Sequence, residues 1–448
     1  MSVSASMRVA VVGGGMAGLA AAHELAAGGA DVVVLEGSDR LGGKLRLGDV
    51  GGLTLDLGAE SMLARRPEAL DLVHTIGLDD RLVNPRTISA AIWTHGALRA
   101  MPATVMGIPA DVAELAASGI AGIDAHVLPV PEGDISVAEF VSARLGRDVL
   151  ERLVEPLLGG VYAGHTDSLS LRATTPQIAA LGADLLAGAT SARAAATATG
   201  PVFAGLVGGV GQLPAAVAAA GGFEVRLAST VRAVTRTADG WRLSVGPTTD
   251  VEHLDVDAVV VAAPAPAAAR LIAQDAPDAA FALAAIDYAS MAIVTYVFDE
   301  PPTFDGSGFL VPPIDGTFIK AATVSSNKWG WVADTGRTVI RASVGRAGEA
   351  TLLQHDDQEI TARALTDLRT AFGALPEPLD AVVQRWGGAL PQYDVGHLER
   401  VELIDRSIAT VPGLEVCGAA HRGVGIPAVI ASGRAAARRV LDAGTMEP

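Results

Sequence analysis

The chain contains 448 residues, 50% of them hydrophobic, and it carries a formal net charge of −17. This length exceeds the size at which one hydrophobic core keeps growing, so we expect two or three domains. The excess of 50 acidic over 33 basic residues argues against nucleic acid as a general partner.

The first predicted unit is a β-strand, a glycine turn and an α-helix between residues 8 and 27. A β-branched run at 9–12 ends at three glycines, and an alanine- and leucine-rich segment follows. Gly13 permits a tight turn, Gly15 lets a pyrophosphate approach the backbone, and Gly18 lets the helix lie close to the strand. A glycine turn in an ordinary α/β protein is the alternative. We predict dinucleotide contacts at Gly13, Gly14, Gly15, Met16, Ala17 and Gly18.

A second predicted strand, at 32–35, ends at an acidic residue. Glu36 follows the glycines by about 20 residues, the spacing at which a carboxylate accepts hydrogen bonds from a ribose diol. An unphosphorylated ribose is therefore favoured. The chain then continues with a second glycine pair at 42–43 and the segment DLGAES at 56–61, for which a nicotinamide enzyme has no general need.

The middle of the chain predicts two different structural units. The segment 134–172 has helical spacing, with breaks expected at Gly146, Gly159-Gly160 and Gly164, and 178–200 predicts a helix plus a loose connection. The segment 291–344 is rich in Val, Thr, Ile and aromatic residues, with turns that predict a separate antiparallel sheet.

Strands predicted within 223–246 and at 256–263 return the chain to the first sheet. The nucleotide-binding domain is therefore expected to be assembled from separated pieces. The predicted domains are a nucleotide-binding domain of residues 7–85, 205–275 and 386–448, a mainly helical insert of 86–204 that faces a partner or a membrane surface, and a substrate-binding domain of 276–385.

The C-terminal segment 417–433 predicts a strand end, a glycine loop and a helix start. Cys417 follows an apolar run and is expected to be a buried core residue. As the single cysteine, it excludes an intramolecular disulfide and favours a reducing, cytoplasmic location. Residues 1–7 lack a signal-peptide pattern, and no long apolar segment predicts more than peripheral membrane contact. The nine histidines show no metal-ligand spacing, so no metal is predicted.

These motifs resemble the FAD signature of the flavin amine oxidase, phytoene desaturase and protoporphyrinogen oxidase superfamily, whose usual Gly-Gly-Arg appears here as Gly42-Gly43-Lys44. Further stretches resemble the soluble protoporphyrinogen and coproporphyrinogen oxidases of Gram-positive bacteria. They are EPLLGGVYAG (155–164), SSNKW (325–329), LPQYDVGHL (390–398) and GVGIP (423–427). The resemblance implies an α/β fold: a Rossmann-like FAD-binding domain built from discontinuous segments, a mixed or antiparallel-sheet substrate domain and a helical insert.

The same resemblance implies FAD as the cofactor. Val231 would face the adenine through its backbone, and Trp386 would lie against the flavin unless it is a core residue. A helix that begins after the GVGIP loop would direct N–H groups toward the flavin. The family's acid after this loop is replaced by Ala428, which removes any hydrogen bond of that acid. The implied contacts beyond the first motif are Glu36, Gly37, Gly43, Lys44, Gly58, Ala59, Glu60, Ser61, Val231, Trp386, Val424, Gly425 and Ile426.

The implied substrate carries propionates, so the pocket should contain cations. Arg65 and Arg66 are the first candidates, and Lys320 and Lys328 the second. An exposed helix-start pair with surface partners such as Glu68 is the alternative for the arginines. Gly164 would let substrate pass close to the backbone or would simply cap a helix.

The resemblance implies that a porphyrinogen loses six electrons in three flavin cycles, with O2 as acceptor and hydrogen peroxide as product. Because the flavin N5 takes the hydride, no catalytic side chain is predicted. Coproporphyrinogen III, oxidised to coproporphyrin III in haem biosynthesis, is favoured over protoporphyrinogen IX, and a ferrochelatase-type enzyme would take the product. The alternatives are a flavin amine oxidase and a non-catalytic tetrapyrrole carrier.

Overall fold

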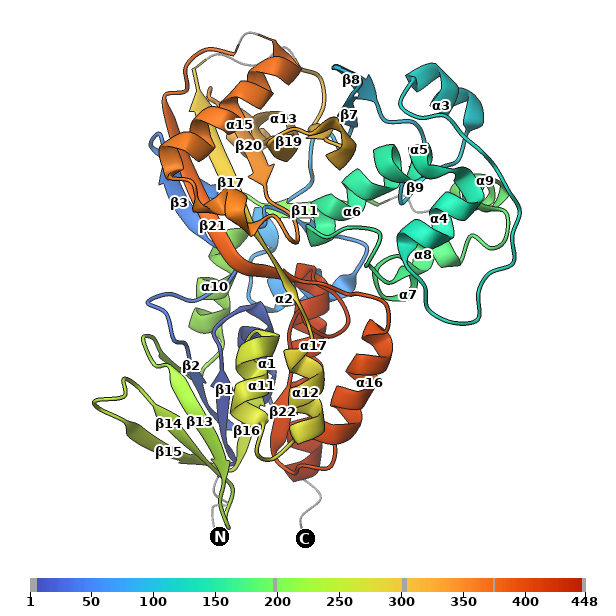
Figure 1. Cartoon of the computed structure of the whole chain (residues 1–448). Coiled ribbons are helices and arrows are strands. Elements are labelled where there is room, and N and C mark those ends of the chain that lie inside the picture. The colour runs from blue at the N-terminus through green and yellow to red at the C-terminus, as the bar shows by residue number, and fades with distance from the viewer. Residues whose placement is uncertain (1–5, 196–199, 300–303, 374, 445–448) are drawn as a thin grey trace.

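The computed structural model describes residues 6–195, 200–299, 304–373 and 375–444. The first residues of the 1–7 segment and part of the connection predicted near 200 therefore lie outside the described residues. A five-stranded parallel sheet with its helices forms the lower half of the view in Figure 1, and a seven-stranded sheet and a group of helices form the upper half.

The parallel sheet has the strand order β12-β2-β1-β16-β22. Its strands are β1 (Arg8–Val12), β2 (Asp31–Leu35), β12 (Glu224–Arg226), β16 (Ala258–Val261) and β22 (Leu414–Val416). Every neighbouring pair is parallel, so the carboxyl ends of all five strands meet at one edge of the sheet. The sheet thus gathers strands from three distant parts of the chain.

Helices cover both faces of this sheet, which explains its continuous apolar strands. Val9 and Val11 of β1 belong to the cluster under α1 (Met16–Ala27) and α17 (Ile426–Gly444). Ala10 and Val12 belong to the cluster under α11 (Ala265–Ile272), α12 (Pro277–Ala284) and α16 (His397–Ile408). A Cβ on Gly433 of α17 would lie 2.0 Å from the Ala17 carbonyl oxygen, so α17 and α1 approach closely.

The seven-stranded sheet has the order β21-β17-β20-β19-β18-β7-β8. Its strands are β7 (Ala90–Thr94), β8 (Ala97–Ala100), β17 (Tyr288–Phe298), β18 (Gly308–Leu310), β19 (Ile319–Val324), β20 (Thr338–Val344) and β21 (Asp380–Pro391). All pairs are antiparallel except β18 with β7. The helix α15 (Asp357–Phe372) packs its apolar side on this sheet.

Three features differ from the sequence expectation. The strands at 231–236 and 241–245 do not join the first sheet and instead form a separate antiparallel sheet with residues 252–256. The range 86–204 is not helical throughout, because β7 and β8 join the seven-stranded sheet through the buried run at 91–94. The predicted helix break at Gly159-Gly160 is wrong, since both glycines lie inside α6 (Glu155–Tyr162). Gly160 faces the seven-stranded sheet, since a Cβ there would make an ordinary contact with Leu310 Cδ2 of β18 at 3.6 Å.

The third group of strands is a meander of β13 (Val231–Arg236), β14 (Trp241–Val245) and β15 (Glu252–Val256) beside the parallel sheet (Figure 1). Among the described residues, no helix is long and apolar enough to cross a membrane.

The remaining strands are β3 (Leu47–Val50), β4 (Leu53–Asp56), β5 (Met62–Leu63), β6 (Leu82–Val83), β9 (Thr104–Val105), β10 (Ile108–Pro109) and β11 (Phe203–Leu206). The remaining α-helices are α2 (Pro67–Thr75), α3 (Val112–Ser118), α4 (Val137–Leu145), α5 (Arg147–Val149), α7 (Leu171–Thr174), α8 (Pro176–Ala179), α9 (Leu185–Ala194), α10 (Leu213–Ala220), α13 (Ser325–Lys328) and α14 (Gly330–Ala333). A π-helical turn spans Leu150–Val154, and 3₁₀ turns span Asp79–Arg81, Val210–Gln212, Pro313–Asp315 and Ala350–Gln354.

Candidate active site

The glycine turn after β1 lies at the carboxyl edge of the parallel sheet. Gly13 has φ +111°, and a Cβ there would lie 2.9 Å from the Ala262 carbonyl oxygen. A Cβ on Gly18 would lie 2.0 Å from the Gly13 carbonyl oxygen, so α1 can approach the turn only with glycine at 18. A Cβ on Gly15, by contrast, would meet no atom within 4 Å. The start of α1 therefore faces open space at Gly15, where a helix N-terminus favours an anion.

Glu36 is held at the end of β2 by hydrogen bonds to its carboxylate. Its Oε2 accepts the Gly14 N–H at 2.7 Å, and its Oε1 accepts the N–H and the hydroxyl of Ser38, each at 2.8 Å. The Glu36 carbonyl accepts the Ser229 N–H at 2.8 Å, and a Cβ on Gly37 would lie 3.1 Å from Thr230 Oγ1. The start of β13, including Val231, is thus adjacent to the predicted ribose carboxylate.

The second glycine pair folds back onto the first turn. The Gly42 N–H donates to the Gly14 carbonyl at 2.8 Å, and a Cβ on Gly43 would lie 3.4 Å from the Gly15 Cα. Arg40 holds this loop because its guanidinium donates to the carbonyls of Leu41, Leu45 and Gly43. The loop and the glycine turn therefore border the same space.

Lys44 follows this loop and lies near the ring of Tyr288. Its side chain retains accessible surface, yet desolvation by the surrounding protein lowers the pKa of its ammonium group. The Lys44 Nζ lies 5.9 Å from the centroid of the Tyr288 ring. A cation with accessible surface but a poorly hydrated environment is well placed to meet an anionic or polar ligand.

Trp386 joins the segment around Gly58 to the strand β21. Its indole Nε1–H donates to the Leu57 carbonyl at 3.2 Å. A Cβ on Gly58 would lie 2.0 Å from the Lys44 carbonyl oxygen and 3.2 Å from Trp386 Cζ2, so the three segments pack tightly. Ala59 remains exposed, and a Cβ on Gly387 would meet nothing within 4 Å. Ala59 and Gly387 therefore border accessible space next to this tightly packed junction.

Glu60 lies in a buried ion-pair cluster. Its Oε1 is 2.7 Å from Lys328 Nζ, and its Oε2 is 2.8 Å from Arg341 Nη1 and accepts the Ser325 hydroxyl at 2.9 Å. Burial alone would raise the pKa of Glu60, but Lys328 and Arg341 outweigh it and hold that pKa well below its ordinary value. Lys328 Nζ also lies 3.4 Å from Ser61 Oγ. The carboxylate of Glu60 is therefore bonded to other side chains of the protein. Arg341 in turn donates to the Gly58 carbonyl.

Asp56 lies next to this cluster. Its carboxylate accepts the N–H groups of Val210 at 3.0 Å and Gly211 at 2.8 Å. Burial raises the pKa of Asp56 to about 6, although Arg341 and the two N–H groups oppose the shift. A void of about 10 Å³, room for one water molecule, separates Asp56 and Glu60 from the indoles of Trp329 and Trp331.

The loop between β22 and α17 completes the carboxyl edge of the sheet. Gly418 has open space at its Cβ position, and a Cβ on Gly425 would meet only Pro427 Cδ at 3.9 Å. Val424 packs against the core of the helical group, and Ile426 and Pro427 begin α17. Gly425 immediately precedes α17, so the positive end of this long helix dipole lies beside an open position. Several glycines thus face open space, Glu36 offers the carboxylate predicted to bind a ribose, and α17 supplies a helix N-terminus. Together these features fit a dinucleotide cofactor.

The predicted substrate residues have several different environments. Arg66 Nη2 lies 2.7 Å from Glu68 Oε1, and Arg65 is exposed beside it at the start of α2. Lys328 bonds Glu60, as described above. A Cβ on Gly164 would lie 2.2 Å from Gln392 Oε1, so this glycine has a packing role and Ala163 is the residue that caps α6.

Lys320 is buried in β19 with no hydrogen-bond partner for its ammonium group among the described residues. Desolvation and the nearby Arg346 lower its pKa to about 7. Of the predicted cations, it is therefore the one whose charge depends on pH near neutrality.

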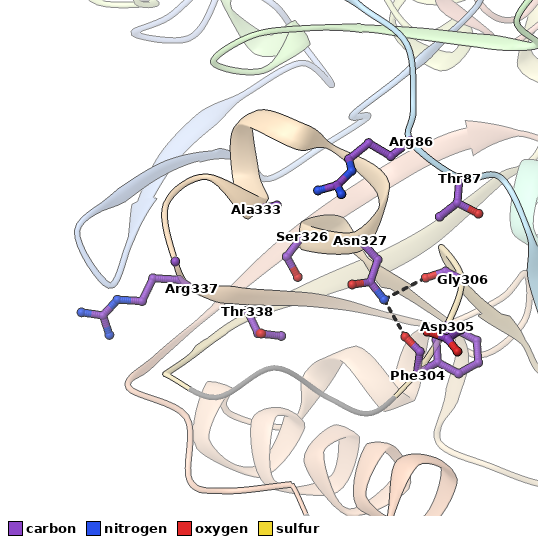
Figure 2. Close-up of a pocket in the computed structure, with 11 residues that line it drawn as sticks. Arg86, Thr87, Phe304, Asp305, Gly306, Ser326, Asn327, Ala333, Arg337 and Thr338 are labelled. Carbon is purple, nitrogen blue, oxygen red and sulfur yellow. Dashed lines mark hydrogen bonds between the residues drawn. The ribbon is translucent and has the colours of Figure 1, made fainter.

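A cavity of about 880 Å³ lies elsewhere, at the rim of the seven-stranded sheet. Figure 2 shows it between Arg86 and Thr87, the residues around α13, and the start of β20. Asn327 fixes one wall, because its Nδ2 donates to the carbonyls of Phe304 and Gly306. None of the predicted cofactor residues lines this cavity, so its volume alone does not locate the active site.

Four side chains near the candidate site were missed by the sequence prediction: Arg40, Arg341, Tyr393 and His397. Arg341 offered a signal, because a lone arginine within the apolar strand run TVIRASV requires a buried partner. Tyr393 and His397 lie in the LPQYDVGHL stretch, which was noted without a role. The partners of all four residues lie in other segments, so spacing along the chain does not reveal them.

Comparison with known proteins agrees with this geometry. Residues 16–441 match the family model of flavin-containing amine oxidoreductases. The protein named coproporphyrinogen III oxidase from Mycobacterium leprae is 38% identical over 95% of this chain and 96% of its own length. The protein of the same name from Bacillus subtilis is 30% identical over 97% of each chain. A crystal structure from Exiguobacterium, provisionally named a protoporphyrinogen oxidase, superposes with a TM-score of 0.85 at 31% identity and covers 98% of this chain and 99% of that chain.

The family match extends from residue 16 to residue 441, which is nearly the whole chain, and it includes Glu36, the second glycine pair and the loop before α17. The relatives are also similar in length, so no large part of the fold is left without a counterpart. The chain therefore belongs to the family of flavin-containing amine oxidoreductases.

Proposed function

We propose that this protein binds FAD and uses O2 to oxidise a porphyrinogen, with coproporphyrinogen III as its preferred substrate and coproporphyrin III as its product. The observation that carries the proposal is the full-length similarity to proteins named coproporphyrinogen III oxidase. The glycine edge of the parallel sheet supports it independently, because it has the form of a dinucleotide site.

The residues proposed to hold FAD come from the carboxyl edge of the parallel sheet and from the neighbouring strands β13 and β21. The turn at 13–18 would bind the pyrophosphate, Glu36 would bind the ribose, and Val231 would border the adenine. Lys44 would contact a phosphate or the ribose, and Trp386 and the loop at 424–426 would border the isoalloxazine. When bound, the flavin supplies hydride acceptance at N5 and reoxidation by O2. The chain's own task is orientation, and α17 would place its positive end where the flavin becomes anionic on reduction.

A porphyrinogen has propionates, and their recognition is proposed for Arg65 and Arg66. Arg66→Ala should raise KM more than it lowers kcat, because the guanidinium would contact the substrate away from the reacting carbon. The control is Arg242→Ala, which removes an exposed arginine paired to Asp255 in the meander. A KM equal to that of the parent protein would remove Arg66 from the substrate site.

The substrate assignment is tested by side-by-side peroxide assays with coproporphyrinogen III and protoporphyrinogen IX. We expect a higher kcat/KM for coproporphyrinogen III. A higher value for protoporphyrinogen IX would overturn the preference while leaving the reaction class intact.

Catalysis is distinguished from carriage by anaerobic mixing of the FAD-loaded protein with the porphyrinogen. An oxidase bleaches the yellow flavin spectrum, and a tetrapyrrole carrier leaves it unchanged. Addition of a simple amine under the same conditions tests the amine oxidase alternative.

Cellular context is part of the same proposal. A cytoplasmic location is supported by the lone, buried Cys417, which is typical of a reducing compartment. A porphyrin product is consumed by metal insertion, so a ferrochelatase-type enzyme is the proposed recipient. Co-elution of the two proteins with labelled product would support a direct transfer.

A further inference from the structure

The loop between β22 and α17 is held by two side chains from a distant segment. Tyr393 and His397 are 1% and 0% exposed, and their rings stack with centroids 3.8 Å apart and an interplanar angle of 12°. Both rings lie against the loop at 418–425, which forms part of the carboxyl edge of the parallel sheet. A stacked, buried pair of this kind is stiff, because neither ring can rotate without displacing the other.

Three hydrogen bonds join this ring pair to the loop backbone. The Tyr393 hydroxyl donates to the Ala419 carbonyl at 2.5 Å and accepts the Gly423 N–H at 2.7 Å. The Nε2 of His397 lies 2.8 Å from the His421 carbonyl. A carbonyl only accepts, so Nε2 carries the proton and His397 is the donor. Two side chains therefore bond three backbone groups within five consecutive loop residues.

The segment that carries the ring pair is itself anchored to the helical group. The Tyr393 carbonyl accepts the Ser170 N–H at 2.8 Å, and the Val395 N–H donates to the Ser168 carbonyl at 3.0 Å. Gln392 Nε2 donates to the Tyr162 carbonyl at the end of α6 at 2.9 Å. The position of α6 and its neighbours is thus linked to the position of the loop.

The neutral state of His397 is favoured by its surroundings. Burial lowers its pKa to about 4, although the hydrogen bond to the His421 carbonyl opposes the shift; Arg400 and Arg422 lower the pKa further, and Asp134 raises it. Its Nδ1 has no hydrogen-bond partner among the described residues. The imidazole therefore acts as a fixed donor at neutral pH and not as an acid or base.

We propose that Tyr393 and His397 are positioning residues that fix the loop at 418–425 against the isoalloxazine, so that its backbone N–H groups meet the flavin in one geometry. The proposal rests on FAD binding but not on the identity of the substrate. It assigns a role to the LPQYDVGHL stretch, which the cofactor and substrate predictions leave unused.

The test is Tyr393→Phe, which keeps the ring and removes the hydroxyl that bridges two loop groups. We expect the dissociation constant of FAD to rise by about tenfold, since two backbone groups lose their partner. The visible absorption bands of the bound flavin should shift, and kcat should fall while KM for the porphyrinogen stays unchanged.

The matched control is Tyr296→Phe. Tyr296 is equally buried, and its hydroxyl donates to the Thr361 carbonyl at 2.7 Å under α15, away from the loop. It should lower thermal stability by a similar amount without changing FAD affinity or the flavin spectrum. If Tyr393→Phe also keeps the parent FAD affinity and spectrum, the tyrosine is only structural and the proposal is overturned.

A second pair of variants tests His397. His397→Phe keeps an aromatic ring but cannot donate, whereas His397→Gln can still donate to the His421 carbonyl. We expect His397→Phe to weaken FAD binding and His397→Gln to recover part of it; equal affinities would contradict the assigned donor. Should neither His397 variant fold, the comparison of Tyr393→Phe with Tyr296→Phe decides alone. FAD titration needs no porphyrinogen, so its result stands even if the protein oxidises another substrate.

Discussion

Gly15 is the N-cap of α1 and Gly18 lies three residues further, within the helix, but the two glycines have opposite surroundings. A side chain at Gly18 would collide with the Gly13 carbonyl, whereas a side chain at Gly15 would enter open space. Glycine at 18 is therefore required by the fold, whereas glycine at 15 is not, and its requirement is proposed to come from the ligand. Substitutions at the two positions should therefore separate an effect on FAD affinity from an effect on protein stability.

Gly15→Ala should leave the melting temperature of the apoprotein unchanged and raise the dissociation constant of FAD at least tenfold. The backbone at Gly15 is extended, with φ −75° and ψ 174°, so alanine is tolerated there. Gly18→Ala should instead lower the melting temperature, because its methyl group meets the turn itself. Calorimetry and FAD titration check both changes, with Gly133→Ala as a control at another open position. Normal FAD affinity of Gly15→Ala would place the pyrophosphate elsewhere.

Lys320 provides a prediction of pH dependence. Its folded-state pKa of about 7 lies below the ordinary lysine value, so the unfolded chain binds more protons between about pH 7 and 10.5. The stability cost of this lysine is therefore fully present below pH 7 and disappears as the pH rises toward 10.5. Lys320→Met should stabilise the apoprotein at pH 6, by at most about 5 kcal/mol, and much less at pH 10. Denaturant titrations at the two pH values measure the difference, and an equal gain at both would contradict the assignment.

At the scale of elements, the Glu60 cluster joins the segment after β4 to α13 and β20. It brings a carboxylate from residue 60 against cations from residues 328 and 341, and Arg341 continues to the Gly58 carbonyl. The candidate cofactor segment at 58–61 is thus fixed to the seven-stranded sheet. The sequence motif predicts a cofactor contact at Glu60, and the structure pairs the carboxylate of this residue with Lys328 and Arg341.

Glu60→Gln should destabilise the protein by about 3–5 kcal/mol, because Lys328 and Arg341 would remain buried without their counter-charge. Urea denaturation of the apoprotein measures this loss. Asp255→Asn provides the contrast, since Asp255 pairs with Arg242 on the exposed meander and its loss should change stability little. Similar results for the two variants would show that the cluster is not a significant ion-pair network.

The elements also show which features the sequence could predict. The strand, turn and helix at 8–27 follow from local residue spacing, and so does the placement of Glu36. The partners of Glu60 do not, because ion pairs between distant segments depend on packing that no local pattern encodes. The glycines at 159 and 160 were misjudged for the same reason: their helix forms because tertiary packing outweighs their low helix propensity.

At the scale of the whole molecule, the parallel sheet gathers strands from three distant parts of the chain. The neighbours β1, β16 and β22 come from residues 8–12, 258–261 and 414–416. Composition and short strand patterns were enough to predict this assembly from separated pieces. They did not predict that β7 and β8 would belong to the seven-stranded sheet, since the pairing of short strands depends on partners far along the chain.

A ligand at this edge should stabilise the assembled chain as a unit. FAD at about 100 times its dissociation constant should raise the free energy of unfolding by about 2.7 kcal/mol. ADP at the same concentration should give a smaller increase, because it can reach the glycine turn and Glu36 but not Trp386 or the 424–426 loop. Thermal and urea unfolding with each ligand measure the effect. Equal stabilisation by ADP and FAD would place the isoalloxazine outside these segments.

The end of β22 has one more consequence for a protein proposed to generate hydrogen peroxide. Cys417 is 2% exposed, and burial raises the pKa of its thiol to about 12. Peroxide attacks the thiolate form, so the only sulfhydryl of the chain should escape oxidation by the product of each turnover. Repeated catalysis should thus leave no sulfenic acid at Cys417, and Ellman's reagent should react with its thiol only after the protein has unfolded.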